Sequence, residues 1–271
     1  MLDHAARFVG DIPRHYDLKL GPHLFYDYAL DLARRVAAAN PRCVLEIAAG
    51  TGIVTRQLRD ALPQTTHLVA SDLNAPMLTI AQEKFGRAER VGFQTADAIA
   101  LPFADGSFEA VVCQFGIMFV PDKGKAHREA FRVLAPGGRY YFSVWDSFDF
   151  NPFARIAHET VAGFFVQAPP DFFAVPFGYH QIDSIKASLL AAGFYAMSVH
   201  VLKIDKTISH TRHFAEGLIY GNPIVAEIGV RGTARPDQIV EAVTAALQRE
   251  FGADPGRMPL QAIIFEAKRG G

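Results

Sequence analysis

The sequence has few of the features that mark several large classes of protein. Only two of its 271 residues are cysteines, Cys43 and Cys113, and both lie in apolar runs, so we expect buried, reduced thiols. No Cys or His residues have the spacing of metal ligands. No apolar run reaches the roughly 18 residues of a membrane span, and residues 1–10 lack a signal-peptide pattern. These absences predict a soluble, cytoplasmic protein without a metal site.

Clustered positive charge is also missing. The formal net charge is -1, and no run of Lys or Arg is long enough to form a basic stripe. Because nucleic-acid binding depends on such clusters, we expect no nucleic-acid partner. Half of the residues are hydrophobic, which is enough for a large core in one domain or two small ones.

Short apolar runs alternate with helical patterns between residues 42 and 145. The predicted strands are Cys43–Ile47, His67–Ser71, Val91–Thr95, Ala110–Gln114 and Arg139–Trp145. The predicted helices are Val54–Ala61, Pro76–Phe85 and Lys123–Leu134, the last stopped by Pro136-Gly137-Gly138. This alternation predicts an α/β fold, with a parallel sheet covered by helices on both faces.

The flanking segments have a different character. Residues 1–40 contain two helical stretches, the second at Leu24–Ala38, and form a predicted flank or lid before a core at 41–145. Residues 142–179 are dense in aromatic side chains, which indicates a packed connection, the wall of an apolar pocket, or both. The remaining predicted elements are a helix at Gln181–Ala192, strands at Tyr195–Ile208 and Pro259–Lys268, and a mostly helical insertion at 209–258 that includes Pro236–Glu250. We expect 146–271 to form a cap within the same domain.

A glycine-containing loop follows the first predicted strand. The pattern Glu46-x-Ala48-x-Gly50-x-Gly52 stands between a strand and a helix, where glycine allows a tight turn and close approach of a ligand. Alone it is weak evidence, because several nucleotide-binding folds use such a loop. Three further polar positions, Asp72, Asp97 and Gln114, end later strands. Ligands of open α/β sheets bind at these carboxyl ends, so the sequence predicts one binding site there.

Four segments together resemble class I methyltransferases, in particular the type 11, ubiquinone-biosynthesis-like group. They are VLEIAAGTG (44–52), SDLNAPML (71–78), TADAIALPFADGSFEAVVCQFGIMFV (95–120) and REAFRVLAPGGRYYFSVW (128–145). The resemblance covers about residues 15–205 and the last strand. It implies a Rossmann-like, mostly parallel sheet of seven strands in the order 3-2-1-4-5-7-6. It also implies S-adenosylmethionine as cofactor and S-adenosylhomocysteine as product.

The resemblance also implies the roles of single residues. At the methionine end of the cofactor it places Tyr16, Glu46, Ala48, Gly50, Thr51 and Gly52. At the ribose and adenine it places Asp72, Leu73, Met77, Asp97 and Ala98, with the Asp72 carboxylate on the ribose hydroxyls. Gln114 and Phe115 would flank the sulfonium. The family commonly has glycine where this chain has Ala48, which reduces the freedom of the loop.

Other interpretations of these residues stay open. Asp72 and Asp97 are typical helix caps or turn residues, and Met77 and Phe115 are typical core residues. A nicotinamide-dependent dehydrogenase would need a third glycine at position 55, where this chain has Thr55. A non-catalytic module of the same fold, binding the cofactor or a partner, is the second alternative.

The class of the methyl acceptor is inferred mainly by excluding other classes. The fourth strand is followed by Gln114-Phe115-Gly116 and not by the Asn/Asp-Pro-Pro-aromatic motif of enzymes that methylate nucleic-acid amines. We therefore expect a small, apolar or aromatic acceptor, with O-, C- and N-methylation all open. If a general base is used, His180 is the first candidate, and the others are His158, His210, His213, Tyr179 and Tyr220. Monomer and homodimer are both left open.

Overall fold

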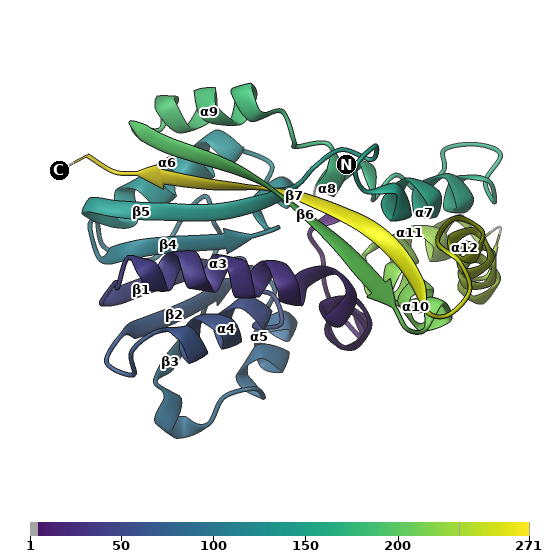
Figure 1. Cartoon of the computed structure of the whole chain (residues 1–271), viewed down its shortest axis with the longest axis horizontal. Coiled ribbons are helices and arrows are strands. Elements are labelled where there is room, and N and C mark those ends of the chain that lie inside the picture. Colours follow the sequence, from purple (N-terminus) through teal and green to yellow (C-terminus); the bar gives the residue numbers. More distant parts are fainter. Residues whose placement is uncertain (1–4, 233, 271) are drawn as a thin grey trace.

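The computed structural model describes residues 5–232 and 234–270, and its centre is a seven-stranded sheet in the order β3-β2-β1-β4-β5-β7-β6 (Figure 1). The strands are β1 (Cys43–Ile47), β2 (His67–Asp72), β3 (Val91–Thr95), β4 (Phe108–Gln114), β5 (Leu134–Trp145), β6 (Ala196–Ile208) and β7 (Gly256–Lys268). The first five are parallel, whereas β7 pairs antiparallel with both β5 and β6. The predicted strand order is confirmed.

Helices cover both faces of the sheet. They are α2 (Ile12–His15), η1 (Tyr16–Phe25), α3 (Tyr26–Ala38), α4 (Ile53–Ala61), α5 (Ala75–Gln82), η2 (Arg87–Glu89), η3 (Ile117–Phe119), α6 (Lys123–Val133), α7 (Pro152–Ala162), α8 (Ala174–Phe177), α9 (Ile182–Ala191), α10 (Thr211–Tyr220), α11 (Ile224–Arg231) and α12 (Pro236–Phe251). In Figure 1, α3 and α4 cross in front of the sheet and α6 lies behind it. Within residues 5–232 and 234–270, no helix is long and apolar enough to cross a membrane.

The N-terminal flank contains a feature that helical periodicity does not detect. Residues Tyr16–Phe25 form a π-helix that continues directly into α3, and the N–H of Tyr26 donates to the carbonyl of Gly21, five residues earlier. A π-helix has more residues per turn than the 3.6-residue pattern used to recognise helices, and such segments are frequent at functional sites. Tyr16, Leu20 and Leu24 of η1 line an internal cavity of the protein.

The Pro136-Gly137-Gly138 segment is not the helix stop predicted from sequence. Helix α6 ends earlier, at Val133, and β5 already begins at Leu134. The pairing with β4 shifts register at this point, so the tripeptide forms an irregularity within β5. Glycine fits there because Gly137 has a φ of 78°, a left-handed conformation that costs little without a Cβ.

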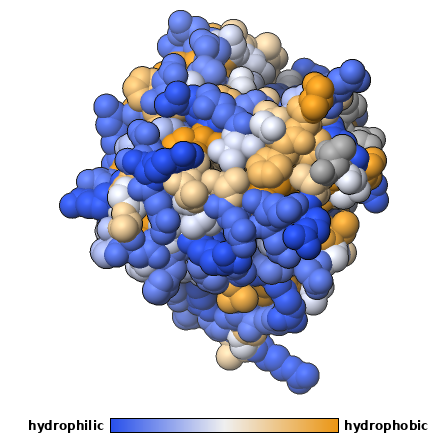
Figure 2. All heavy atoms as spheres, turned by 90° about the vertical axis from the view of Figure 1, so that its right-hand side faces the viewer, coloured by the Kyte–Doolittle hydropathy of each residue, from blue (hydrophilic) through white to orange (hydrophobic). Residues whose placement is uncertain are grey.

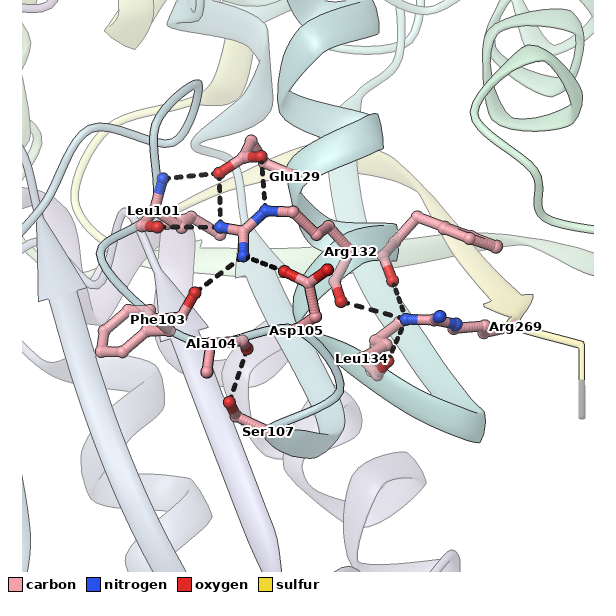
Figure 3. A network of polar contacts seen from close by, with 10 residues as sticks. Leu101, Phe103, Ala104, Asp105, Ser107, Glu129, Arg132, Leu134 and Arg269 are labelled. Carbon is pink, nitrogen blue, oxygen red and sulfur yellow. Dashed lines mark hydrogen bonds and ion pairs between the residues drawn. The ribbon is translucent and has the colours of Figure 1, made fainter.

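One arginine ties the C-terminal end of α6 to the loop between β3 and β4 (Figure 3). Arg132 donates to both carboxylate oxygens of Glu129 at 2.8 Å, to Asp105, and to the carbonyls of Leu101 and Phe103. Glu129 in turn accepts from the N–H of Leu101 at 2.7 Å. Because Arg132 satisfies several backbone groups at once, it fixes the loop that follows Asp97 and Ala98.

The chain between β6 and β7 forms the helices α10, α11 and α12. They lie at one end of the sheet together with α7, on the right in Figure 1. Strands β6 and β7 pair along their whole length, from Ala196↔Lys268 to Ile208↔Gly256. The insertion therefore leaves and re-enters the sheet at one place. The division of the chain into flank, core and cap stays a prediction.

Candidate active site

A cavity of about 690 Å³ lies at the carboxyl ends of β1, β2 and β4, beneath η1 and helices α7, α8 and α10. This volume is within the roughly 300–1,000 Å³ typical of small-molecule sites. Most of the predicted site residues line it, namely Tyr16, Ala48, Gly50, Asp72, Leu73, Met77, Asp97, Ala98, Gln114 and Phe115. A second cavity of about 30 Å³ is bordered by Glu46 and Thr51. Gly52 and His180 line neither of the two.

Asp72 holds the glycine loop in place. The side chain is 6% exposed, and its two oxygens accept hydrogen bonds of 2.8 Å from the N–H groups of Gly50 and Asn74. Burial raises the pKa of Asp72, and the hydrogen bonds from Asn74 and Gly50 oppose that shift. Oδ1 also accepts from the Nδ2 of Asn74 at 3.4 Å, whereas Oδ2, which accepts from Gly50, keeps a further lone pair. Asp72 can thus fix the loop and still accept a hydrogen bond from a ligand in the cavity.

Glu46 is buried beneath the loop and is paired with a residue of α4. The hydroxyl of Thr55 donates to its carboxyl group at 2.6 Å. Burial raises the pKa of Glu46 to about 8, and the Thr55 hydrogen bond opposes this shift. Position 55, which a dinucleotide-binding loop would fill with glycine, therefore carries a side chain with a partner in the core.

Ala48 fits into the loop because Gly116, which follows β4, has no side chain. Ala48 has a φ of 53°, in the left-handed region that favours glycine. A Cβ on Gly116 would lie only 2.3 Å from the Cβ of Ala48 and 3.0 Å from the Sγ of Cys113. The methyl group of Ala48 thus fills the space that a side chain at position 116 would need.

Position 52 requires glycine for structural reasons. Gly52 has a φ of 77° at the start of α4, and a Cβ there would lie 2.8 Å from the Cβ of Ala81 in α5. The glycine therefore lets two helices approach closely, although it does not line the cavity. Sequence reasoning alone could not separate this role from ligand contact.

The end of the cavity next to β3 combines polar and apolar walls. Asp97 accepts a hydrogen bond of 3.0 Å from the N–H of Ile99, as a turn residue does, and also lines the cavity. Met77 is buried and Leu73 is 54% exposed. Both border the same space.

Asn74 brings the N-terminal segment over the cavity, which the sequence analysis did not predict. Its amide accepts from the N–H of Phe8 at 3.2 Å and donates to the carbonyl of Ala6 at 2.9 Å. Ala6, Arg7 and Phe8 consequently form part of the wall. The only sequence signal was the position of Asn74 at the start of a helix, which does not reveal a partner 66 residues away.

The opposite end of the cavity is apolar. Its lining includes Leu24, Phe25, Met118, Phe119, Val120, Trp145, Phe153, Phe172, Phe173, Pro176, Phe177 and Leu218. Trp145 stacks on Phe115 with ring centroids 4.0 Å apart and an interplanar angle of 5°. The aromatic segment predicted as a pocket wall does supply this surface. The ionisable side chains among the described lining residues are Arg7 in the N-terminal segment, Tyr16 at the start of η1, Asp72 at the end of β2 and Asp97 in the loop after β3.

The aromatic wall faces inward and not toward solvent. Phe153, Phe172, Phe173 and Phe177 are each at most 6% exposed. Figure 2 shows the face of the molecule on the right of Figure 1, where hydrophobic residues in the upper part are surrounded by hydrophilic ones. Phe153, Phe172, Phe173 and Phe177 therefore lie in the interior of the protein.

His180 is held away from the other predicted site residues. Its Nδ1 lies 2.9 Å from the carbonyl of Phe177, and its Nε2 lies 2.9 Å from the amide nitrogen of Gln181. A neutral imidazole satisfies both contacts, with Nδ1 donating and Nε2 accepting. The structure does not bring His180 to the cavity, and its predicted catalytic role stays a prediction.

Comparison with known sequences gives a match over the central part of the chain. Residues 45–142 match the family described as Methyltransferase domain. The ubiquinone/menaquinone biosynthesis C-methyltransferase UbiE of Methylobacterium nodulans is 38% identical over 136 residues, 48% of this chain and 54% of that protein. The demethylmenaquinone methyltransferase of Thermus thermophilus is 45% identical over 112 residues, 41% and 49% of the two. The chain thus spans about half the length of these curated relatives.

Solved structures share the fold at low sequence identity. The YcgJ protein of Bacillus subtilis has a TM-score of 0.60 at 20% identity, covering 90% of this chain and 99% of its own. The phosphoethanolamine N-methyltransferase 2 of Haemonchus contortus, solved with phosphomonomethylethanolamine and S-adenosylhomocysteine, has a TM-score of 0.60 at 18% identity over 96% and 57% of the two chains. These similarities establish the Rossmann-like fold of class I methyltransferases.

Proposed function

We propose that this chain, whose residues 45–142 match a methyltransferase domain, transfers a methyl group from S-adenosylmethionine to a small, largely apolar acceptor. One observation carries the proposal. A single cavity joins polar groups at the strand ends, among them Asp72 and Gly50, to an aromatic end built by the cap. The two ends suit a nucleoside-containing cofactor and an apolar acceptor.

The residues at the polar end fit the cofactor. A Cβ on Gly50, which has a φ of 57°, would point at the Cε of Met77 at 3.4 Å, so glycine keeps the loop open toward the ligand. In this proposal Asp72 accepts from the ribose hydroxyls, and Asp97 and Ala98 contact the edge of the adenine. When bound, the cofactor supplies a methyl group activated by its sulfonium charge.

Gln114 is the polar residue placed between the two ends. Its amide nitrogen donates to the carbonyl of Phe25 at 3.3 Å, whereas its Oε1 is buried without a described partner. A buried oxygen without a donor is costly unless a ligand supplies one. We assign Gln114 and Phe115 to the contact between cofactor and acceptor.

The aromatic end would exclude water and hold the acceptor in line with the methyl group. Positioning of this kind can supply much of the rate of a transfer between two bound molecules. Apart from Tyr16, the ionisable side chains of the described lining belong to the polar end and the N-terminal segment. This favours an acceptor whose nucleophilic atom needs no base from the protein. A ring of the size of a quinone precursor suits this space, and the relatives reported above are named as a ubiquinone/menaquinone biosynthesis C-methyltransferase and a demethylmenaquinone methyltransferase.

Methyl transfer from radiolabelled S-adenosylmethionine to a panel of phenols, quinols and apolar amines tests the proposal. We expect transfer to at least one class of ring compound and binding of S-adenosylhomocysteine to the protein alone. Cofactor binding without transfer to any member of the panel would favour the non-catalytic alternative. Binding of a nicotinamide cofactor in place of S-adenosylhomocysteine would contradict the proposal.

A further inference from the structure

The apolar end of the cavity contains a polar residue from the helical insertion, Asn222. It lies between α10 and α11, lines the cavity, and is 7% exposed. The lining of the same cavity also includes Leu218, Phe153 and Phe177, all apolar, and Gly221, which precedes Asn222, packs against the backbone of Tyr16. An amide in such surroundings needs partners for its polar atoms, because water does not supply them freely.

Only one of the two polar atoms of Asn222 has a protein partner among the described residues. Nδ2 donates to the carbonyl of Leu218 at 3.0 Å, which also fixes the orientation of the amide. Oδ1 accepts from no described residue, and it does not belong to the atoms that are enclosed on all sides. Since Asn222 borders the cavity, Oδ1 is open to it.

Two glycines hold this part of the insertion tightly against η1. A Cβ on Gly217 would lie 2.8 Å from the Cδ2 of Leu20, and one on Gly221 would lie 3.0 Å from the backbone N of Tyr16. Helix α10 therefore approaches the backbone of η1 as closely as glycine allows. This contact places Asn222 beside the cavity wall and restricts its movement away from the cavity.

We propose that Oδ1 of Asn222 accepts a hydrogen bond from a hydroxyl or N–H group of the acceptor. This inference rests on the proposed function and deepens it. The acceptor is then an apolar ring that carries a hydrogen-bond donor, such as a phenol, a quinol or an aryl amine. An oxidised ring with carbonyl groups alone cannot donate to Oδ1. The helical insertion supplies the polar contact that selects the acceptor.

The test compares two ligands of nearly equal shape, 2-naphthol and 2-methylnaphthalene. Their dissociation constants are measured by equilibrium dialysis in the presence of S-adenosylhomocysteine, for the wild type, Asn222→Leu and Asn222→Asp. The quantity of interest is the ratio of the two constants, because a general loss of packing affects both ligands alike. Leu218→Ala is the matched control, since it enlarges the same wall without removing a polar atom.

We expect Asn222→Leu to reduce the preference for 2-naphthol about tenfold, the usual worth of one uncharged hydrogen bond. Asn222→Asp keeps an accepting oxygen and should retain most of the preference, and Leu218→Ala should leave the ratio unchanged. An equal ratio in wild type and Asn222→Leu, or no binding of 2-naphthol to the wild type, would overturn the assignment. Failure of the wild type to bind S-adenosylhomocysteine would instead count against the proposed function.

Discussion

The hydroxyl of Thr55 donates a 2.6 Å hydrogen bond to the buried carboxyl group of Glu46. The pair joins the end of β1 to the first turn of α4 beneath the glycine loop. Its geometry explains why position 55 holds threonine where a dinucleotide-binding loop would hold glycine. The first prediction concerns the protonation of this pair.

Glu46 should make stability depend on pH. Its pKa rises from an ordinary 4.5 to about 8 in the folded chain, mainly through burial, so the folded state binds a proton that the unfolded state releases. Its contribution is therefore fully present below about pH 4.5 and is lost as the pH rises toward 8. We expect the free energy of unfolding of the wild type, relative to Glu46→Gln, to fall over this range. Urea denaturation at several pH values measures both free energies of unfolding. A difference between wild type and Glu46→Gln that does not change with pH would contradict the assigned pKa shift.

Asp72 should be essential for cofactor affinity. Replacing Asp72 with Ala removes the proposed ribose contact and releases the N–H of Gly50. We expect S-adenosylhomocysteine to bind at least about tenfold more weakly, or about 1.4 kcal/mol. Calorimetry measures the change. Asp60→Ala is the control, because Asp60 pairs with Arg56 on the surface of α4, away from the cavity. An unaltered dissociation constant in Asp72→Ala would remove the ribose assignment.

Ala48 and Gly116 should be energetically coupled. Gly116→Ala alone forces two Cβ atoms to within 2.3 Å, and overpacking of this kind costs about 1–3 kcal/mol. Ala48→Gly alone should be nearly neutral, because relief of about 1–2 kcal/mol of left-handed strain offsets the lost methyl packing and the added chain entropy. The double variant should recover at least half of the loss. Denaturant unfolding of the four proteins tests this, and additive effects would refute the coupling.

The fluorescence of Trp145 should respond directly to ligand binding. This residue is the single tryptophan of the chain, lines the cavity and stacks on Phe115. We expect titration with S-adenosylhomocysteine to change its emission, because Phe115 lies in the proposed cofactor contact. Trp145→Phe should abolish the signal while calorimetry still detects binding. Wild-type emission that stays constant at saturation would place the ligand elsewhere.

His180→Ala tests whether the sequence-based candidate takes part in catalysis. Both ring nitrogens of His180 already have hydrogen-bond partners, the carbonyl of Phe177 and the amide of Gln181, and His180 does not line the cavity. We therefore expect turnover with a proven acceptor to change less than about threefold. A loss of more than about tenfold, with cofactor affinity intact, would reinstate His180 as the base.

The sequence pattern predicted the parallel part of the sheet because its strands are apolar runs separated by clear helical patterns, whereas the order of the seven strands was implied by the family resemblance. Observed strand ends differ from the expected ones mainly where pairing extends a strand, as at Leu134 and Gly256. The π-helix at Tyr16–Phe25 was not predictable from a 3.6-residue pattern. The glycine loop and Asp72 were found because their spacing follows the strand ends. Asn74 acts through contacts distant in sequence, and Asn222 reaches the cavity because Gly217 and Gly221 pack against η1; no local motif records either arrangement.

The pairing of Ile208 with Gly256 has an evolutionary consequence. Because the insertion enters and leaves the sheet at adjacent positions, its length and content can change without altering the strand register. Related chains could thus acquire new acceptor preferences by exchanging this insertion while they keep the same cofactor loop. A graft of residues 209–255 between such enzymes should change the part of the wall formed by Leu218 and Asn222 and leave the cofactor loop as it is.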